Sequence, residues 1–214
     1  MVQFSLWDIL TFLLGAMRWT VALSLIAFVG GGLVGMTLLL LRFAQLRGVG
    51  MVVSWYVQVF QGTPLLMQLF LVYFGLALMG MDTSPLVSAA ICLTLYASAY
   101  LTEIWRGCVN SVPRGQWEAS ASLALDFPQQ MRHVILPQAV RVAIAPTVGF
   151  MVQIIKGTAL ASVIGFVELT KAGQMISNAT YQPFLAYTFV GLLYFALCYP
   201  LSRWSQRLET RRLA

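Results

Sequence analysis

Charged residues are scarce in this chain. Only 9% of the 214 residues are charged and 59% are hydrophobic, and the mean hydropathy is +0.81. Soluble domains carry about 25% charged residues, so this composition predicts an integral membrane protein, with residues 1–214 as a single domain. The net charge of +6 comes from basic residues spread between apolar runs. Orientation signals of membrane proteins lie in such places, so we expect no nucleic-acid binding.

Metal-binding and nucleotide-binding patterns are also missing. There is one histidine, and Cys92, Cys108 and Cys198 show no CxxC or disulfide-framework spacing. A zinc site takes about four ligands, so we expect no metal site and interpret the cysteines as packing thiols. No GxxxxGK[ST] phosphate loop occurs, so ATP chemistry is not expected in this chain. No acid, base or metal cluster lies within the apolar runs, which makes a membrane enzyme the weakest function class.

Five apolar runs are long enough to cross a bilayer, which takes about 20 helical residues. They predict an all-α integral membrane protein with five transmembrane helices. Before the first run, residues 4–17 have an amphipathic pattern that predicts a short helix at the membrane interface. The spans are expected at approximately residues 19–41, 52–79, 84–105, 137–165 and 184–204.

Glycine and proline mark special places in these runs. The GGGLVG sequence at Gly30–Gly35 predicts close packing against a neighbouring helix, with flexible glycines that lack a partner as the alternative. The Gly-Thr-Pro sequence at residues 62–64 predicts a break or kink, because proline removes a backbone hydrogen bond. Pro137 and Pro146 should bend the fourth span or mark its start. Residues 168–183 are expected to form a polar connection.

Positive charge gathers on one side of the predicted membrane. Five spans place the termini on opposite sides, and a cytoplasmic C-terminus puts ten of the thirteen Lys and Arg residues on the cytoplasmic side. The positive-inside rule therefore predicts the N-terminus outside and the C-terminus inside. It also places the polar segment 111–137 in the cytoplasm. The cytoplasmic residues are Arg42, Arg47, Arg106, Arg114, Arg132, Arg141, Arg203, Arg207, Arg211 and Arg212; the others are Arg18, Lys156 and Lys171.

The polar segment lies between the third and fourth spans. Ser111 and Pro113 predict a helix start, and residues 114–125 have the pattern of a short amphipathic helix with a small-residue surface. Asp126 lies three residues before Gln129, which is a capping-box spacing that predicts a second helix. Two helices at an angle would form a docking surface that transmits the movement of a partner to the membrane-spanning helices. A solvated loop helix without a partner is the alternative.

The second half of this segment resembles the EAA loop of ABC-importer permeases. The family pattern is EAA, three residues, Gly, nine residues and I-x-L-P, and residues 118–137 read EASASLALDFPQQMRHVILP. Ser120 replaces an alanine of the pattern, and Ala124 holds the usual glycine position without the backbone freedom of glycine. The matching positions are Glu118, Ala119, Val134, Leu136 and Pro137.

Further motifs extend the likeness to the polar amino acid permeases over roughly residues 15–210. Residues 61–66 (QGTPLL) are similar to the RGTPLL motif, and residues 100–116 (YLTEIWRGCVNSVPRGQ) to YxxEIxRGGIxSVPxGQ. Residues 156–160 (KGTAL) stand where KDTSL or KNTSL is usual. Gln61 thus replaces an arginine and Gly157 an acidic or amide residue, so a substrate charge preference is not carried over.

The resemblance implies a type I ABC importer permease of the histidine/glutamine/glutamate/arginine family in a bacterial inner membrane. That fold has five spans and a short cytoplasmic coupling helix between the third and fourth. The implied partners are a dimer of ATPase subunits that hold ATP and Mg, a second permease (identical or paralogous), an extracytoplasmic binding protein, an amino acid substrate and membrane lipid. The chain itself would bind no cofactor and catalyse no reaction. The implied coupling residues, with Glu118 making a polar contact, are Arg114, Gln116, Glu118, Ala119, Ser120, Ala124, Leu136 and Pro137.

One charge, Lys156, lies within the fourth span. A charge at mid-bilayer costs on the order of 3 kcal/mol on insertion scales, so we expect it to face the bundle interior or water. Pairing with Glu168 or with a partner subunit is the alternative. We predict a substrate pathway lined by Gln153, Lys156 and Thr158, facing Gln58, Gln61 and Gln68, whose 3- and 7-residue steps predict one shared helix face. Contact of these amides with another helix stays open.

Two other function classes stay open beside an importer that works by alternating access. A passive channel for small polar solutes would need neither ATP nor an amphipathic cytoplasmic helix. A membrane scaffold that anchors a cytoplasmic protein would explain the docking segment but not Lys156.

Overall fold

The computed structural model describes residues 5–44 and 47–213. Every regular element within these residues is a helix. Four helical segments are long and apolar enough to cross a membrane, and two short helices joined at a bend make a fifth span if they are counted together. The predicted all-α membrane fold is therefore confirmed. The segments are α1 (Leu6–Phe43), α4 (Pro85–Asn110), the stretch Phe127–Ile164 and α9 (Pro183–Leu213), and the bent pair is α2 (Val49–Gly62) with α3 (Leu65–Leu78).

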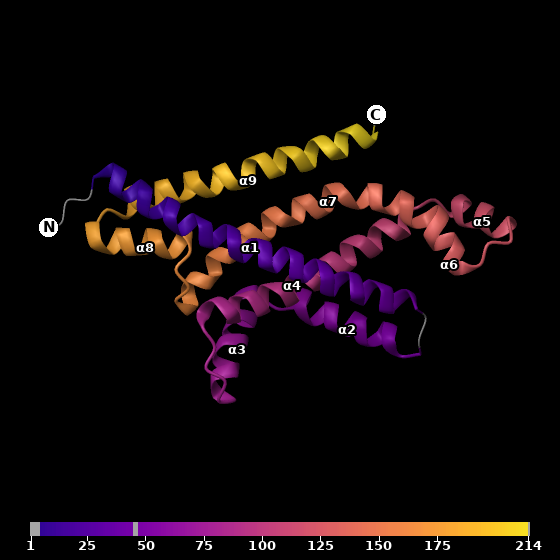
Figure 1. The fold of residues 1–214 in the computed structure, drawn as a ribbon, viewed down its shortest axis with the longest axis horizontal. Helices are drawn as coiled ribbons and strands as arrows, with labels where there is room; N and C mark the ends of the chain where they lie inside the picture. The colour runs from indigo at the N-terminus through magenta and orange to yellow at the C-terminus, as the bar shows by residue number, and fades with distance from the viewer. Residues whose placement is uncertain (1–4, 45–46, 214) are drawn as a thin grey trace.

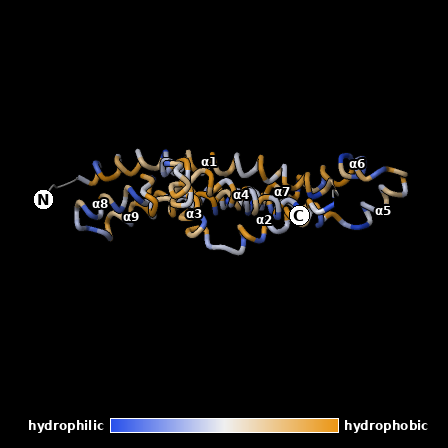
Figure 2. The backbone as a smooth tube through the Cα atoms, turned by 90° about the horizontal axis from the view of Figure 1, so that it is seen from below, coloured by the Kyte–Doolittle hydropathy of each residue, from blue (hydrophilic) through white to orange (hydrophobic). Residues whose placement is uncertain are grey.

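The helices form an elongated, flat bundle. α1, α4 and α9 run from the end that holds the N-terminus toward the end that holds α5 (Arg114–Ser122), and α7 (Leu136–Gly157) runs back (Figure 1). Hydrophobic residues dominate the middle of the long axis (Figure 2). Hydrophilic segments gather at the two ends, around α8 (Leu169–Thr180) and around α5 and α6 (Phe127–Gln130). This distribution suits a bundle that crosses a bilayer along its long axis.

α1 begins at a capping box. The Ser5 hydroxyl accepts a hydrogen bond from the Asp8 N–H, and the Asp8 carboxylate accepts one from the Ser5 N–H. The helix then continues for 38 residues. The prediction of a separate interface helix over residues 4–17 is therefore wrong, because residues 5–17 form the N-cap and first turns of α1. Residue 4 lies outside the described residues. Ile9 and Leu13 pack in one cluster with residues of α8 and α9, which holds this half of α1 in line with the span.

Small residues let α1 lie close against α4. A Cβ atom on Gly31 would come within 2.4 Å of the Ala97 Cβ, and one on Gly35 within 3.0 Å of the Ser98 carbonyl oxygen. The Thr102 hydroxyl donates to the Gly35 carbonyl at 3.1 Å. The packing role predicted for the GGGLVG sequence is confirmed, and the neighbouring helix belongs to the same chain.

The second predicted span is broken rather than kinked at residues 62–64. Pro64 has extended backbone at the N-cap of α3, and α2 and α3 are bent by 105°. The Gln68 side chain closes the bend, because its Nε2 atom donates to the carbonyls of Phe60 (2.8 Å) and Thr63 (3.0 Å). The last carbonyls of a helix have no partner within it, so this amide satisfies the end of α2.

Residues 168–183, expected as a polar connection, contain α8 instead. Glu168 is fully buried at the N-cap of α8. Its carboxylate accepts hydrogen bonds from the Lys171 N–H (2.9 Å), the Tyr194 hydroxyl (2.7 Å) and the Thr20 hydroxyl (3.4 Å). Burial raises the pKa of this carboxyl above its ordinary value. One carboxylate therefore joins α1, α8 and α9.

Candidate functional site

α5 is the short helix predicted within the polar segment. It covers Arg114–Ser122 rather than 114–125, and Pro113 occupies its N-cap position without a side-chain cap. Ser111, predicted as part of the helix start, instead ends α4, where its hydroxyl donates to the Cys108 carbonyl. The existence of the helix is thus confirmed, and its bounds are corrected at both ends.

The turn after α5 explains why the helix ends early. Ala124 has a φ of 55°. Its N–H donates to the Ala121 carbonyl at 2.9 Å, and the Leu125 N–H donates to the Ser120 carbonyl at 3.4 Å. These two bonds form a Schellman motif, in which the left-handed residue is usually glycine. An L-residue in this conformation is strained by roughly 1–2 kcal/mol, so the alanine makes the turn less stable than a glycine would.

Ala124→Gly is expected to stabilise the end of α5. Glycine adopts the left-handed conformation without a clash. It also raises the entropy of the unfolded chain, which offsets part of this effect, so the free energy of unfolding should rise by about 1 kcal/mol. Hydrogen–deuterium exchange at this turn should slow by about fivefold. Ala121→Gly makes the same change inside the helix, where glycine costs roughly 0.5–1 kcal/mol, so exchange should quicken. Equal responses of the two variants would contradict the strain assigned to Ala124.

α5 packs on one face and leaves the other free. The Ser120 side chain is 3% exposed and its hydroxyl donates to the Trp117 carbonyl, while Trp117 stacks on Phe127 with ring centroids 6.3 Å apart. The Glu118 carboxylate has no hydrogen-bond or ion-pair partner in the part of the chain that the structure describes. The exposed predicted coupling residues are Arg114, Gln116, Glu118, Ala119, Ala124 and Pro137.

The polar segment is joined directly to the fourth span. The capping box predicted at Asp126 is confirmed, and α6 continues through a π-helical turn, η1 (Met131–Ile135), into α7. Pro137 lies in the first turn of α7, next to the half-buried Leu136, and the helix runs on past it. The Gln138 Nε2 atom donates to the Gln116 side chain at 3.1 Å. This hydrogen bond links α5 to α7.

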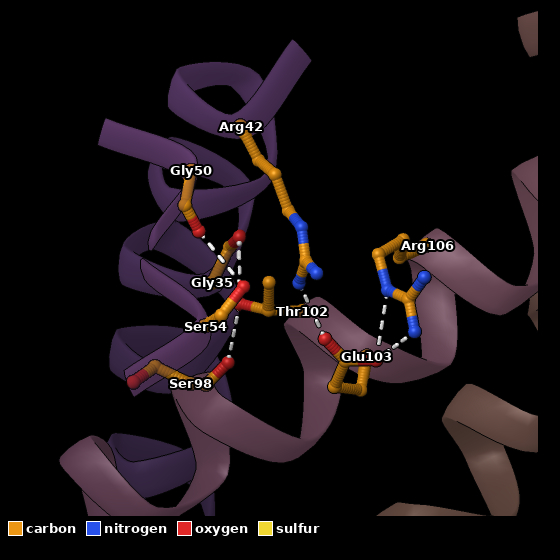
Figure 3. A network of polar contacts seen from close by, with 8 residues as sticks. All are labelled: Gly35, Arg42, Gly50, Ser54, Ser98, Thr102, Glu103 and Arg106. Carbon is orange, nitrogen blue, oxygen red and sulfur yellow. Dashed lines mark hydrogen bonds and ion pairs between the residues drawn. The ribbon is translucent and has the colours of Figure 1, made fainter. Parts of the chain in front are cut away.

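An ion network ties α1 to α4 at the end of the bundle that holds α5. Glu103 lies between two arginines (Figure 3): Arg42 Nη1 is 2.6 Å from one carboxylate oxygen, and Arg106 Nε is 2.8 Å from the other. Glu103 and Arg106 form an i,i+3 ion pair within α4. The contact with Arg42 comes from the fold, since the two residues are 61 positions apart.

Four of the six predicted pathway residues are exposed. Gln153 and Lys156 lie three residues apart on α7, and Gln58 and Gln61 lie near the end of α2. Within the described residues Lys156 forms no ion pair, so the alternative of pairing with Glu168 finds no support. Lys156 is therefore an exposed charge within a span.

Gln68 and Thr158 are buried instead. Gln68 is 6% exposed on α3, across the bend from Gln58 and Gln61, so the prediction of one shared face is wrong because it assumed an unbroken helix. Thr158 is fully buried, and its hydroxyl donates to the Ile155 carbonyl at 2.7 Å. Thr158 begins η2 (Thr158–Ile164), a 3₁₀-helical turn. Both side chains satisfy backbone groups at helix breaks.

The structure is a helical membrane bundle with a broken second span and a pair of short helices, α5 and α6, between its third and fourth spans. The family described as binding-protein-dependent transport system inner membrane component matches residues 31–214. The chain belongs to this family.

Two relatives in Bacillus subtilis (strain 168) show the extent of the likeness. The L-cystine transport system permease protein TcyB is 34% identical over 99% of this chain and 89% of its own length. The probable amino-acid ABC transporter permease protein YckA is 33% identical over 84% of this chain and 80% of its own length. The chain is therefore similar to these permeases over most of its length.

Solved structures share the fold. A chain of an amino acid ABC transporter crystallised with histidines matches with a TM-score of 0.91 at 30% identity, over 98% of this chain and 100% of that one. A chain of the inward-facing MetNI methionine ABC transporter matches with a TM-score of 0.77 at 20% identity, over 97% of both chains. The fold is that of a type I ABC importer permease.

Proposed function

We propose that this chain is the membrane subunit of an ATP-driven importer that moves amino acids across a bacterial inner membrane. The observation that carries the proposal is α5, which leaves Glu118 free on its outer face and is bonded to α7 through Gln116 and Gln138. A helix that is exposed on one side and bonded to a span on the other is suited to transmit the movement of a cytoplasmic partner. The similar chains named as amino-acid and cystine permeases support amino acids as the substrate class.

The proposed assembly contains two permeases, two ATPase subunits and an extracytoplasmic binding protein. The positive-inside rule supports a periplasmic N-terminus and a cytoplasmic C-terminus. ATPase closure on ATP would displace α5, and η1 and α7 would carry this movement into the membrane. The break between α2 and α3 and the change from α7 to η2 provide places where the path can reorient. Alternating access follows from these movements.

The structure favours Gln153 and Lys156 over the other candidates for the substrate path. Both are exposed on α7, the helix that α5 would move. A charge in a span that has no ion-pair partner among the described residues is expected to face water or a neighbouring subunit. Gln58 and Gln61 remain candidates at the end of α2, whereas the Gln68 amide and the Thr158 hydroxyl bond to backbone carbonyls.

Lys156→Met is expected to lower amino acid uptake at least tenfold, because the path loses its one charged side chain. Folding and association with other subunits should persist, since no ion pair within the described residues is broken. Lys171→Met is the control: it removes a lysine that bonds to Gln174 on α8, away from the path. Uptake and substrate selectivity unchanged by Lys156→Met would contradict the pathway assignment.

The direct test of the proposal is uptake in proteoliposomes made from the affinity-purified complex. Radiolabelled amino acids should accumulate only with ATP and Mg inside and binding protein outside. A non-hydrolysable ATP analogue should give no accumulation. Flux that needs neither ATP nor the binding protein would overturn the importer and establish the channel.

A further inference from the structure

A cleft of about 780 Å³ lies between α1, α4 and α7, beside α6 and η1. Its walls include residues from Met36 to Ala44 on α1 and from Leu136 to Val148 on α7. α4 contributes Trp105 and Val109. The cleft thus lies between the two helices that the ion network joins and the helix that α5 would move.

The cleft offers almost no hydrogen-bonding side chains. Thr147 is the one lining residue with a hydroxyl group, and that hydroxyl already accepts a hydrogen bond from Trp105 Nε1 at 2.9 Å. The other lining residues have apolar side chains. A polar group buried without a partner is unfavourable, so an amino acid or water would bind poorly here. The apolar walls therefore favour a hydrocarbon ligand.

The length of the cleft corresponds to one leaflet of a bilayer. Leu136 and Val148 are twelve positions apart on α7, which is about 18 Å at the helical rise of about 1.5 Å per residue. Half of a hydrocarbon core of about 30 Å is about 15 Å. The cleft also begins at α6, at the hydrophilic end of the bundle (Figure 2). One acyl chain of a lipid whose headgroup lies at the level of α6 would extend along the cleft.

Two exposed arginines lie next to the wall residues at the end of the cleft near α6. Arg132 is exposed and directly follows the lining residue Met131, and the exposed Arg47 lies three positions beyond the α1 wall. Of the acids nearest in sequence to the walls, Asp126 caps α6 and Glu103 is paired with two arginines. This balance favours an anionic headgroup, since basic residues at the membrane surface attract anionic lipids.

We propose that the cleft binds one acyl chain of an anionic phospholipid of the cytoplasmic leaflet, with its headgroup phosphate at the end of the cleft next to Arg47 and Arg132. The proposal rests on the orientation given above for the importer. The lipid fills the space between α1 and α7, so it contacts the helix through which α5 acts on the membrane.

Trp105 provides the probe for the test, because it lines the cleft. The complex is placed in phosphatidylcholine nanodiscs that contain increasing fractions of phosphatidylglycerol with brominated acyl chains. The fluorescence of Trp105 is obtained as the difference between the unchanged protein and the Trp105→Phe variant. This fluorescence should be quenched at low phosphatidylglycerol fractions, and the quenching should then saturate. Brominated phosphatidylcholine should quench it only in proportion to its bulk fraction.

Three variants separate the cleft from the rest of the surface. Ala143→Phe fills the cleft and should abolish the saturable quenching. Val29→Phe adds the same ring to an exposed position of α1 outside the cleft, and should leave the quenching unchanged. Joint replacement of Arg47 and Arg132 by Gln should raise the half-saturating phosphatidylglycerol fraction at least threefold without altering quenching by phosphatidylcholine.

Equal, non-saturating quenching by both lipids would overturn the site, because the cleft would then meet bulk lipid only. Quenching by neither lipid would also overturn it, and a photo-crosslink from a probe at Ile144 would then show whether a second permease covers the cleft. The assay needs neither ATP nor an amino acid. Its failure is therefore distinguishable from failure of the uptake assay.

Discussion

Glu118→Lys is expected to abolish ATP-dependent amino acid uptake, with a loss of at least tenfold, while the permease still folds and reaches the membrane. The carboxylate is exposed on α5 and has no partner within the described residues, so its replacement breaks no contact inside the chain. The proposed polar contact with the ATPase would be replaced by a repelling or unpaired charge. Uptake and ATP hydrolysis are measured together in proteoliposomes, and permease yield serves as the measure of folding.

The matched control is Glu209→Lys, which makes the same charge change at an exposed position near the end of α9. It should retain most of the uptake, because α9 is not the helix proposed to couple. Normal uptake by Glu118→Lys would remove this residue from the coupling mechanism. Equal loss in both variants would point to a general effect of charge on the cytoplasmic face.

Gly31→Leu is expected to prevent accumulation of folded protein. Even a Cβ atom at this position would lie 2.4 Å from the Ala97 Cβ and 3.1 Å from the Ser98 backbone nitrogen, so α1 and α4 would have to separate along their contact. Overpacking of a well-packed interior costs about 1–3 kcal/mol, occasionally more, and contact with backbone leaves little room for adjustment. Yield of monodisperse protein in size-exclusion chromatography and its melting temperature are the measurements.

Gly15→Leu serves as the control on the same helix. A Cβ atom there would meet nothing within 4 Å, and leucine has the higher helix propensity, so yield and melting temperature should be unchanged or raised. If Gly31→Leu and Gly15→Leu behaved alike, the close α1–α4 contact would not be what holds the bundle together.

The spans could be predicted because an apolar run of sufficient length is a local property of the chain. The same reasoning failed where a tertiary contact decides the outcome. Residues 6–17 look like a surface helix alone, but Ile9 and Leu13 pack with residues of α8 and α9. α8 was missed because its N-cap residue, Glu168, looks like a charged loop residue until Thr20 and Tyr194 are brought to it.

The helices of the polar segment 111–137 were largely predictable, since the helix caps and the motif are continuous in sequence. Its early end at Ser122 was not, because it depends on the left-handed conformation of Ala124. The positions of the predicted pathway residues were less predictable. Helical spacing placed Gln58, Gln61 and Gln68 on one face, whereas the 105° bend turns the Gln68 amide to the end of α2.

The most direct test of the central claim is co-purification of the tagged permease from its native membranes in mild detergent, followed by mass spectrometry. The account predicts a P-loop ATPase in equimolar amount that is lost from the Glu118→Lys variant but kept by Glu209→Lys. A second, different permease in the same fraction would identify a heterodimer, and its absence a homodimer. Recovery of the permease with no ATPase would contradict the claim that α5 couples this membrane subunit to ATP hydrolysis.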